Sequence, residues 1–293
     1  MGTRTGSFPI GFRRGWSDWQ KNDLKALANW AKSTGFEVLD LGTPSPEDLA
    51  VLSAAGLKIG TADLLDWPKL MSSDAGKRKE AVARNTEYVT KLASLGCKRY
   101  FTVAIPEDAA KPRLENYKLA VEGYGELARN IEKTGAKILF EGWPGGGALP
   151  NPMCNPETYR AIFKDIGSKA VGVNYDPSHL IRMGIDHVRF VEEFADRVGH
   201  VHGKDTEVVG DALYEYGLYQ PSLFSKGHGF GEHAWRYTLP GHGCARWTKI
   251  FQVLAGVKYD GAVCVELEDE NFNGTEKGEK DALIASLAFL RSV

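Results

Sequence analysis

Three carboxylates and one imidazole stand at comparable places between residues 141 and 266 of the chain. Glu141, Asp176 and Glu266 each come at the end of a short apolar segment, and His202 lies near the end of another. A carboxylate directly after a buried segment is costly unless a partner neutralises it. Residues of this kind, gathered at one edge of a fold, are typical of metal binding and of acid–base chemistry.

The histidines are confined to one part of the chain. All seven lie between His179 and His242, and the first 147 residues contain none. His200 and His202 are two positions apart, so in a strand both would point to the same side. We interpret His202 as a candidate metal ligand, with an interior histidine as the alternative, and His200 as an interior hydrogen-bonding residue.

A divalent cation would satisfy Glu141, Asp176, His202 and Glu266 together. This ligand set of carboxylates and one imidazole favours one Mn²⁺, with Mg²⁺, Co²⁺ or Zn²⁺ as alternatives, over a structural zinc site with thiolates. Four protein ligands on an octahedral ion would leave two positions for substrate oxygens. The alternative is that the three carboxylates pair with lysines of the same rim.

A repeated pattern indicates how these residues are positioned. Short apolar segments alternate with amphipathic helical patterns, many of which end at a glycine. The apolar segments are continuous, as in strands buried on both faces, and they cover residues 8–12, 36–41, 57–61, 97–105, 136–141, 170–175, 198–203 and 261–266. Eight strand–helix units predict an α/β fold, a single-domain (β/α)₈ TIM barrel over residues 1–293. A doubly wound sheet would need a glycine-rich turn after the first strand, which residues 11–19 lack.

One long segment, residues 205–246, interrupts the pattern after the seventh strand. We expect it to be an irregular insertion that acts as a lid over the C-terminal face, where barrels of this kind place their active sites. Its Arg236 could hold a substrate oxygen or a phosphate, or be a plain surface residue. Trp16 and Trp143 fall in predicted rim loops, where an indole could pack against a sugar or against a helix.

Composition excludes several classes of function. The formal net charge is −2, which argues against a nucleic-acid partner, and no apolar run approaches the roughly 20 residues of a membrane span. The four cysteines are widely spaced without a CxxC pair, and residues 1–12 lack the apolar region of a signal peptide. We therefore expect a cytoplasmic protein that acts on a small molecule.

Five short motifs follow the predicted strands in order. They are Phe140-Glu141-Gly142, Asn174-Tyr175-Asp176-Pro177-Ser178-His179, His200-Val201-His202-Gly203-Lys204-Asp205, Pro240-Gly241-His242-Gly243 and Val265-Glu266-Leu267-Glu268-Asp269. Together they resemble the xylose-isomerase-like TIM barrel superfamily of sugar phosphate isomerases and epimerases, over nearly the whole chain from Phe8 to the last helix.

The resemblance implies roles for individual residues. Glu141, Asp176, His202 and Glu266 match the metal ligands of that family, and His179 matches its substrate-binding histidine. In the epimerases the carboxylates at the Glu141 and Glu266 positions also form the proton-transferring pair. The family analogy further suggests a homo-oligomer. His179 could instead cap a turn.

Two features of the sequence indicate how it differs from known branches of the superfamily. The multi-zinc apurinic endonucleases bring further histidines from strands three and four, and residues 60–63 and 102–105 contain none. DNA is therefore not the expected substrate. The glycine-rich segment after Glu141 and the aromatic insertion differ from the epimerases, which leaves the substrate and the reaction open.

We expect a divalent-metal-dependent sugar isomerase or epimerase that removes a proton next to a carbonyl through a metal-stabilised enediolate. Lys204 would add positive charge near the enediolate, or else form a salt bridge at the edge of a loop. The alternative is a dehydratase or lyase that uses the same metal site on a keto-sugar or keto-inositol. A non-catalytic sugar-binding barrel and a phosphodiester hydrolase are more distant alternatives.

Overall fold

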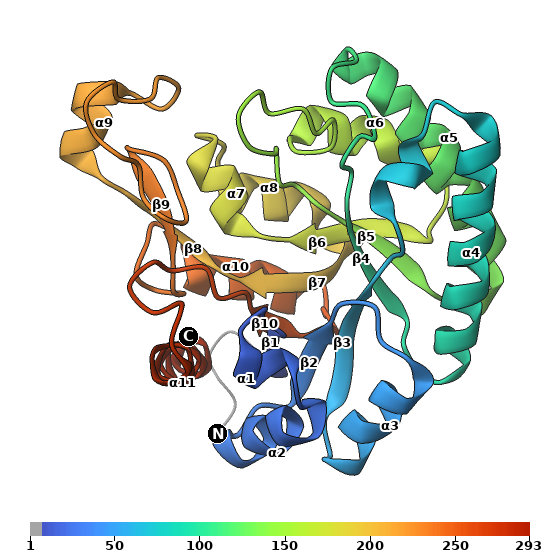
Figure 1. Ribbon diagram of the computed structural model, residues 1–293, viewed down its shortest axis with the longest axis horizontal. Coiled ribbons are helices and arrows are strands. Elements are labelled where there is room, and N and C mark those ends of the chain that lie inside the picture. The colour runs from blue at the N-terminus through green and yellow to red at the C-terminus, as the bar shows by residue number, and fades with distance from the viewer. Residues whose placement is uncertain (1–7) are drawn as a thin grey trace.

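Eight parallel strands close into a barrel in the computed structural model, which describes residues 8–293 (Figure 1). In order around the barrel they are β1 (Ile10–Arg13), β2 (Val38–Leu41), β3 (Lys58–Asp63), β4 (Arg99–Val103), β5 (Lys137–Glu141), β6 (Val171–Tyr175), β7 (Val198–Gly203) and β10 (Val263–Val265). β10 pairs in parallel with both β1 and β7 and thereby closes the barrel. The predicted TIM barrel is confirmed.

Helices surround the strands on the outside of the barrel (Figure 1). The longer ones are α2 (Leu24–Thr34), α3 (Pro46–Ala54), α4 (Ala75–Ser94), α5 (Arg113–Ile131), α6 (Pro156–Ile166), α8 (His187–Phe194), α10 (Trp247–Gly256) and α11 (Glu276–Ser292). Shorter ones are α1 (Asp18–Lys21), α7 (Pro177–Arg182), α9 (Gly210–Tyr216) and the 3₁₀ turns Trp67–Met71, Glu132–Thr134 and Ala195–Arg197.

Local sequence signals explain where several helices begin and end. Asn155 caps α6: its side chain accepts a hydrogen bond from the backbone N–H of Thr158, and the Thr158 hydroxyl accepts one from the backbone N–H of Asn155. Gly35 ends α2 with a φ of +106°, a left-handed conformation that disfavours residues with a Cβ. These signals fix the lengths of the helices, so that each chain segment enters the next strand at a defined residue.

The main apolar core lies between the barrel and its helices. Phe12, Leu27, Tyr124, Phe140 and Ile250 are buried there, and the rings of Tyr124 and Phe140 pack edge to face with centroids 4.7 Å apart. Complete burial of one such side chain stabilises the fold by about 1.5–3 kcal/mol. The core therefore provides a rigid support for polar groups at the strand ends.

The insertion after β7 is not irregular throughout, contrary to the expectation from the sequence. β8 (Asp205–Val208) and β9 (Trp235–Thr238) form a two-stranded antiparallel sheet, and α9 lies in the connection between them. In Figure 1 this hairpin and α9 extend away from the barrel, beside α7. Each strand has only four residues, which is too few for a clear alternation of apolar and polar positions. The role of the insertion as a lid stays a prediction.

Among residues 8–293, no helix has the length and apolar character needed to cross a membrane. The segment on which the signal-peptide argument depends lies in part outside the described residues, since the description starts at residue 8.

Candidate metal and acid–base centre

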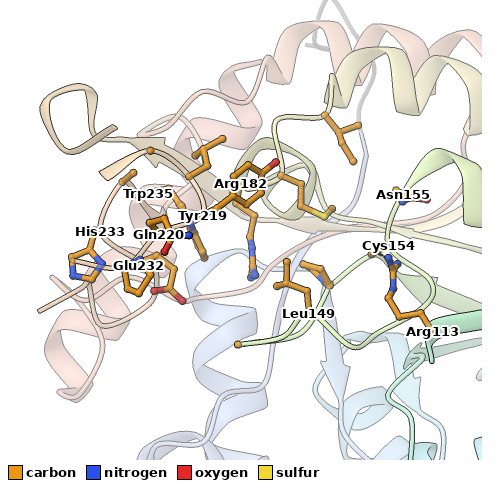
Figure 2. Close-up of a pocket in the computed structure, with 18 residues that line it drawn as sticks. Arg113, Leu149, Cys154, Asn155, Arg182, Tyr219, Gln220, Glu232, His233 and Trp235 are labelled. Carbon is orange, nitrogen blue, oxygen red and sulfur yellow. Dashed lines mark hydrogen bonds between the residues drawn. The ribbon is translucent and has the colours of Figure 1, made fainter. Parts of the chain in front are cut away.

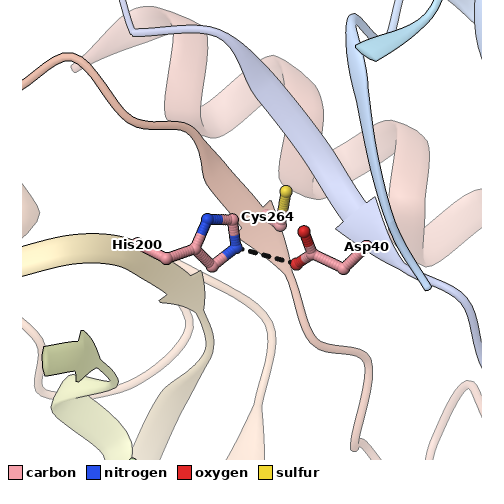
Figure 3. A group of neighbouring side chains, drawn as sticks. All are labelled: Asp40, His200 and Cys264. Carbon is pink, nitrogen blue, oxygen red and sulfur yellow. Dashed lines mark hydrogen bonds and ion pairs between the residues drawn. The ribbon is translucent and has the colours of Figure 1, made fainter. Parts of the chain in front are cut away.

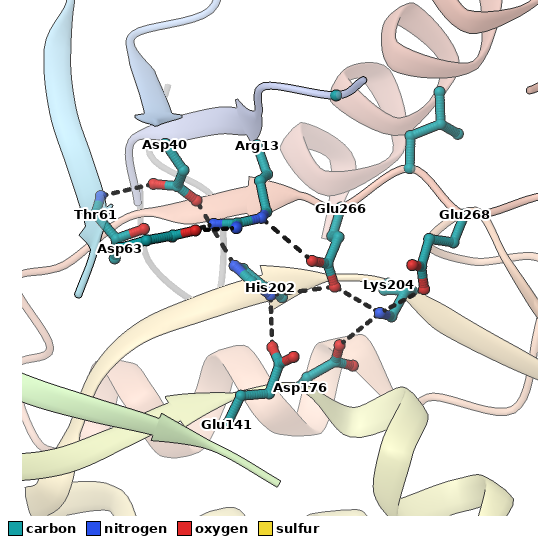
Figure 4. A network of polar contacts seen from close by, with 12 residues as sticks. Arg13, Asp40, Thr61, Asp63, Glu141, Asp176, His202, Lys204, Glu266 and Glu268 are labelled. Carbon is teal, nitrogen blue, oxygen red and sulfur yellow. Dashed lines mark hydrogen bonds and ion pairs between the residues drawn. The ribbon is translucent and has the colours of Figure 1, made fainter. Parts of the chain in front are cut away.

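Glu141, Asp176, His202 and Glu266 converge at the carboxyl end of the barrel. One ligand atom from each of them lies within 4.8 Å of those from the other three. Glu141 ends β5, Asp176 follows β6, His202 belongs to β7 and Glu266 follows β10. These four strands are neighbours around the barrel, which is why residues far apart in sequence meet at one point (Figure 4).

The contacts within this cluster leave polar atoms that a cation would satisfy. His202 Nδ1 lies 2.6 Å from Glu141 Oε2 and 3.3 Å from Glu266 Oε2, yet the geometry gives it no hydrogen bond to any residue between 8 and 293. Asp176 Oδ2 is likewise buried without a hydrogen bond within that part of the chain. Buried polar atoms that make no hydrogen bond are rare because they are costly, and these two have ion-pair contacts alone. The donor set therefore fits a divalent metal ion.

Neighbouring charges shift the pKa values of His202 and Glu266 away from their ordinary values. Burial alone would lower the pKa of His202, but the negative charges of Glu266 and Glu141 raise it well above its ordinary value. Burial would raise the pKa of Glu266, but Lys204 and His202 hold it well below its ordinary value. The positive charges of Lys204 and His202 thus favour the ionised form of Glu266.

Lys204 supplies much of that positive charge from a buried position. Its Nζ lies 2.5 Å from Glu266 Oε2, 2.9 Å from Glu268 Oε2 and 3.3 Å from Asp176 Oδ2. The same ammonium lies over the ring of Tyr237, at 4.5 Å from its centroid. Lys204 is therefore part of the cluster, beside two of the four candidate ligands.

His179 reaches the cluster because α7 begins directly after Asp176. The Asp176 side chain accepts a hydrogen bond from the backbone N–H of Ser178 and caps this short helix. His179 in its first turn then lies with Nε2 3.2 Å from Glu141 Oε1. Its Nδ1 lies 2.7 Å from the hydroxyl of Tyr237 in β9, so the insertion also contributes to the site.

Asp40 on β2 is a member of the surroundings that the sequence analysis missed. It is fully buried and accepts hydrogen bonds from His200 Nε2 and from the backbone N–H of Thr61, both at 2.8 Å. Its Oδ2 also lies 3.8 Å from His202 Nε2, on the side of the ring away from Glu141. Figure 3 shows Asp40 and His200 beside Cys264 inside the barrel. The one available signal was a charged residue within an otherwise apolar strand.

Arg13 at the end of β1 was missed as well. Its guanidinium donates two hydrogen bonds to Asp63, at 2.9 and 2.8 Å, and its Nε lies 3.5 Å from Glu266 Oε1. The guanidinium also stacks on Phe101, 4.5 Å from the ring centroid. Arg13 therefore adds positive charge to the side of Glu266 that faces away from Lys204 (Figure 4).

Three residues with predicted substrate roles have other surroundings. Arg236 on β9 binds two carboxylates, Glu207 Oε2 at 2.7 Å and Asp269 Oδ1 at 3.1 Å. Trp16 is 70% exposed. Trp143 is half-buried, and its carbonyl accepts a hydrogen bond from another loop residue. The substrate roles of these three residues stay predictions.

Comparisons with known proteins agree with the architecture. Residues 5–293 match the family model described as xylose isomerase-like TIM barrel. Among curated relatives, the Bacillus subtilis protein YfiH is 33% identical over 154 residues, which is 52% of this chain and 46% of that protein. The inosose dehydratase of Clostridium beijerinckii is 26% identical over 156 residues, or 53% of this chain and 48% of that enzyme. The chain thus matches about half the length of these two relatives.

A longer match and two solved structures complete the comparison. The inosose dehydratase of Glaesserella parasuis is 25% identical over 270 residues, 85% of this chain and 84% of that enzyme. The structure of 3-keto-D-glucoside 4-epimerase YcjR from E. coli matches 98% of this chain and 100% of its own with a TM-score of 0.68 at 16% identity. That of D-psicose 3-epimerase from Clostridium cellulolyticum H10 matches 97% of this chain and 99% of its own with a TM-score of 0.69 at 19% identity. The chain belongs to the xylose isomerase-like TIM barrel family.

Proposed function

We propose that the protein is a divalent-metal-dependent isomerase or epimerase that moves a proton at a sugar carbon next to a carbonyl. The observation that carries the proposal is the convergence within 4.8 Å of the buried Glu141, Asp176 and His202 and the half-buried Glu266. A divalent cation held by these residues, with Mn²⁺ the favoured ion, would polarise the carbonyl and stabilise the charge that develops on its oxygen. The names of the epimerase structures and of the curated relatives support a sugar or a sugar derivative as the substrate.

Glu141 and Glu266 are the proposed proton-transferring pair. Burial and Glu266 raise the pKa of Glu141, but His202 and the hydrogen bond from His179 lower it below its ordinary value. Both carboxylates are therefore ionised near neutral pH, as a proton acceptor must be. Asn174 Nδ2 donates a hydrogen bond of 2.8 Å to Glu141 Oε2 and fixes the orientation of that carboxylate.

Lys204 and His179 are the proposed substrate-binding residues nearest the centre. The ammonium of Lys204 lies where it could stabilise negative charge on a substrate oxygen. His179 has one ring nitrogen at Glu141 and the other at Tyr237, which fixes the plane of its ring. Arg236 would have to leave its two carboxylate partners before it could bind a substrate, so its role is the weakest part of the proposal.

A dehydratase of a keto-sugar or keto-inositol is the second candidate. The relatives from Clostridium beijerinckii and Glaesserella parasuis carry the name inosose dehydratase, which favours it. Dehydration begins with the same removal of a proton next to a carbonyl and then expels a hydroxide from the neighbouring carbon. Deuterium uptake from solvent without loss of water supports the isomerase, whereas a conjugated product that absorbs in the ultraviolet supports the dehydratase.

The proposal also covers the cellular compartment and the oligomeric state of the protein. All four cysteines are free thiols in the structure, which supports a reducing compartment such as the cytoplasm. A homo-oligomer, which the family analogy suggests, is proposed on that analogy alone.

The experiment that tests this function combines metal analysis with proton exchange. We expect the purified protein to contain about one divalent ion per chain. In D₂O, a panel of ketoses, 3-keto-glucosides and inososes is followed by NMR. The proteins are wild type, Glu141→Gln, Glu266→Gln and the control Glu126→Gln, whose carboxylate is exposed on α5 outside the cluster. Exchange should fall by about 10²- to 10⁴-fold in the first two variants and stay unchanged in the control. Undiminished exchange in both Glu141→Gln and Glu266→Gln would refute the proposal.

A further inference from the structure

A cavity lies beside the centre, between the loop that follows β5 and the insertion that follows β7. Its volume is about 510 Å³, within the usual range for small-molecule sites. Leu149 of the loop lines one side, Tyr219 and Trp235 of the insertion line the other, and Arg182 of α7 lies between them (Figure 2). The cavity therefore combines apolar walls with a guanidinium group.

Two arginines line this cavity, and neither has a carboxylate partner among residues 8–293. Arg113 Nη2 contacts a backbone carbonyl at 3.3 Å and the sulfur of Cys154 at 3.5 Å. Arg182 donates to the hydroxyl of Tyr237 at 2.8 Å and to the carbonyl of Gly145 at 3.0 Å. All of these acceptors are neutral, so both positive charges remain uncompensated by close ion pairs.

The remaining lining adds little negative charge. Of the cavity residues that the structure describes, Glu232 is the one carboxylate, and its side chain is exposed. Arg182 also stacks on Trp235, with its guanidinium carbon 4.5 Å from the ring centroid. Stacking fixes the plane of a guanidinium and leaves N–H groups at its edge for a planar or tetrahedral anion.

A short chain of contacts joins the cavity to the centre. Arg182 donates to the Tyr237 hydroxyl, which lies 2.7 Å from His179 Nδ1, and His179 Nε2 lies 3.2 Å from Glu141. The cavity is therefore separated from the proposed metal ligands by two side chains. A substrate with its reacting carbon at Glu141 would have to pass the side chains of His179 and Tyr237 to place a substituent beside Arg182.

We infer that this cavity binds an anionic group, a carboxylate or a phosphate, at the far end of the sugar substrate. The inference rests on the proposed function for the identity of the sugar and on the two arginines for the charge. Arg113 and Arg182 would provide charge-assisted hydrogen bonds, and Trp235 and Tyr219 would cover the apolar part of the same substituent. The substrate class is then an acidic or phosphorylated sugar derivative rather than a neutral sugar.

The test measures anion binding without turnover. Isothermal titration calorimetry of the full chain is run after metal ions have been removed with a chelating resin, in a buffer without EDTA, so that no metal ion binds the probes and no polycarboxylate competes for the cavity. The probes are inorganic phosphate, glucuronate, glucose 6-phosphate and neutral glucose. The proteins are wild type, Arg113→Gln, Arg182→Gln and the control Arg129→Gln, whose arginine is exposed on the same helix as Arg113 and lies outside the cavity lining.

The expected result is that at least one anionic probe binds wild type about tenfold or more tightly than glucose does. Arg113→Gln and Arg182→Gln should each weaken that binding about tenfold, and Arg129→Gln by less than about twofold. The stronger of glucuronate and glucose 6-phosphate identifies the anion as a carboxylate or a phosphate. Anion binding that is absent, no tighter than that of glucose, or equal in all four proteins would overturn the inference.

A further variant separates this inference from the proposed function. Glu141→Gln removes a candidate ligand of the centre but touches neither arginine. Anion binding that persists in Glu141→Gln, together with proton exchange that is undiminished in both Glu141→Gln and Glu266→Gln, would remove the proposed reaction and leave the anion site standing. No anion binding in wild type, together with exchange that is lost in both glutamine variants, would remove the anion site and leave the proposed reaction standing.

Discussion

Lys204→Met is expected to destabilise the metal-free protein and to increase the stabilisation that a metal ion provides. The Lys204 ammonium is buried and lies within 3.3 Å of oxygens from Asp176, Glu266 and Glu268. Methionine has a similar length but no charge, so the variant leaves the buried Asp176 and the partly buried Glu266 and Glu268 without this partner. Removal of one member of a buried ion pair typically costs about 3–5 kcal/mol.

The size of the thermal shift follows from the length of the chain. Unfolding entropy near 2.1 cal/mol/K per residue gives about 0.6 kcal/mol/K for 293 residues, so the loss corresponds to a Tm lower by about 5–8 °C. A divalent ion would compete with the ammonium for Asp176 Oδ2 and Glu266 Oε2. Without that competitor the ion should bind more tightly, and each tenfold gain in affinity adds about 1.4 kcal/mol of stability at saturating metal.

The assay is thermal unfolding by calorimetry, first with excess EDTA and then with excess MnCl₂. The control is Lys277→Met, because Lys277 is 87% exposed and its pair with Asp281 is a surface pair on a helix. Such a pair contributes at most about 1 kcal/mol, so the control should shift by less than about 2 °C. The reasoning is refuted if metal-free Lys204→Met melts within about 1 °C of wild type, or if Mn²⁺ stabilises it no more than it stabilises wild type.

Three further predictions concern other parts of the molecule. Burial raises the pKa of Glu279, but hydrogen bonds from Ser17, which precedes α1, and from Gln20 and Trp19 within α1 bring it below the ordinary value of 4.5. Its contribution to stability is therefore present above about pH 4.5 and is lost as the pH falls further. Urea unfolding of Glu279→Gln should therefore show lower stability at pH 7 and a shallower loss below pH 4.5 than wild type, and an unaltered pH profile would contradict this. Gly123→Ala should lower the free energy of unfolding by about 1–3 kcal/mol, because a Cβ at this position of α5 would overlap the carbonyl oxygen of Leu70. In the control Gly125→Ala the nearest atom to the new Cβ lies at 3.5 Å, so its free energy of unfolding in the same assay should stay within about 1 kcal/mol of that of wild type. Tyr237→Phe should lower turnover about tenfold without weakening metal binding, and calorimetric loss of metal affinity would show that the hydroxyl acts on the ligands instead.

The sequence was sufficient for the barrel because its signals are local. Continuous apolar segments and helical periodicity recur along the chain, and eight such units have few alternative arrangements. The members of the cluster could be found for the same reason. Glu141, Asp176 and Glu266 each end a predicted strand, and the carboxyl ends of parallel strands in a barrel share one face.

The missed residues depend on contacts that no local pattern reveals. Arg13 and Asp40 come from β1 and β2, and only closure of the barrel through β10 brings those strands next to the strands of the cluster. β8 and β9 are short, and their pairing joins residues on both sides of a long connection, such as Asp205 and Thr238. That pairing also decides the surroundings of Arg236, whose partner Glu207 lies opposite it in the hairpin.

The central claim is that one divalent ion binds between four side chains at the carboxyl end of the barrel. Crystals of the protein soaked with MnCl₂ and measured at the manganese absorption edge test it most directly. We expect one strong anomalous peak bounded by Glu141, Asp176, His202 and Glu266, with the Lys204 ammonium displaced from at least one of its carboxylates. A Mn²⁺-soaked crystal with no peak among these four side chains would contradict the account.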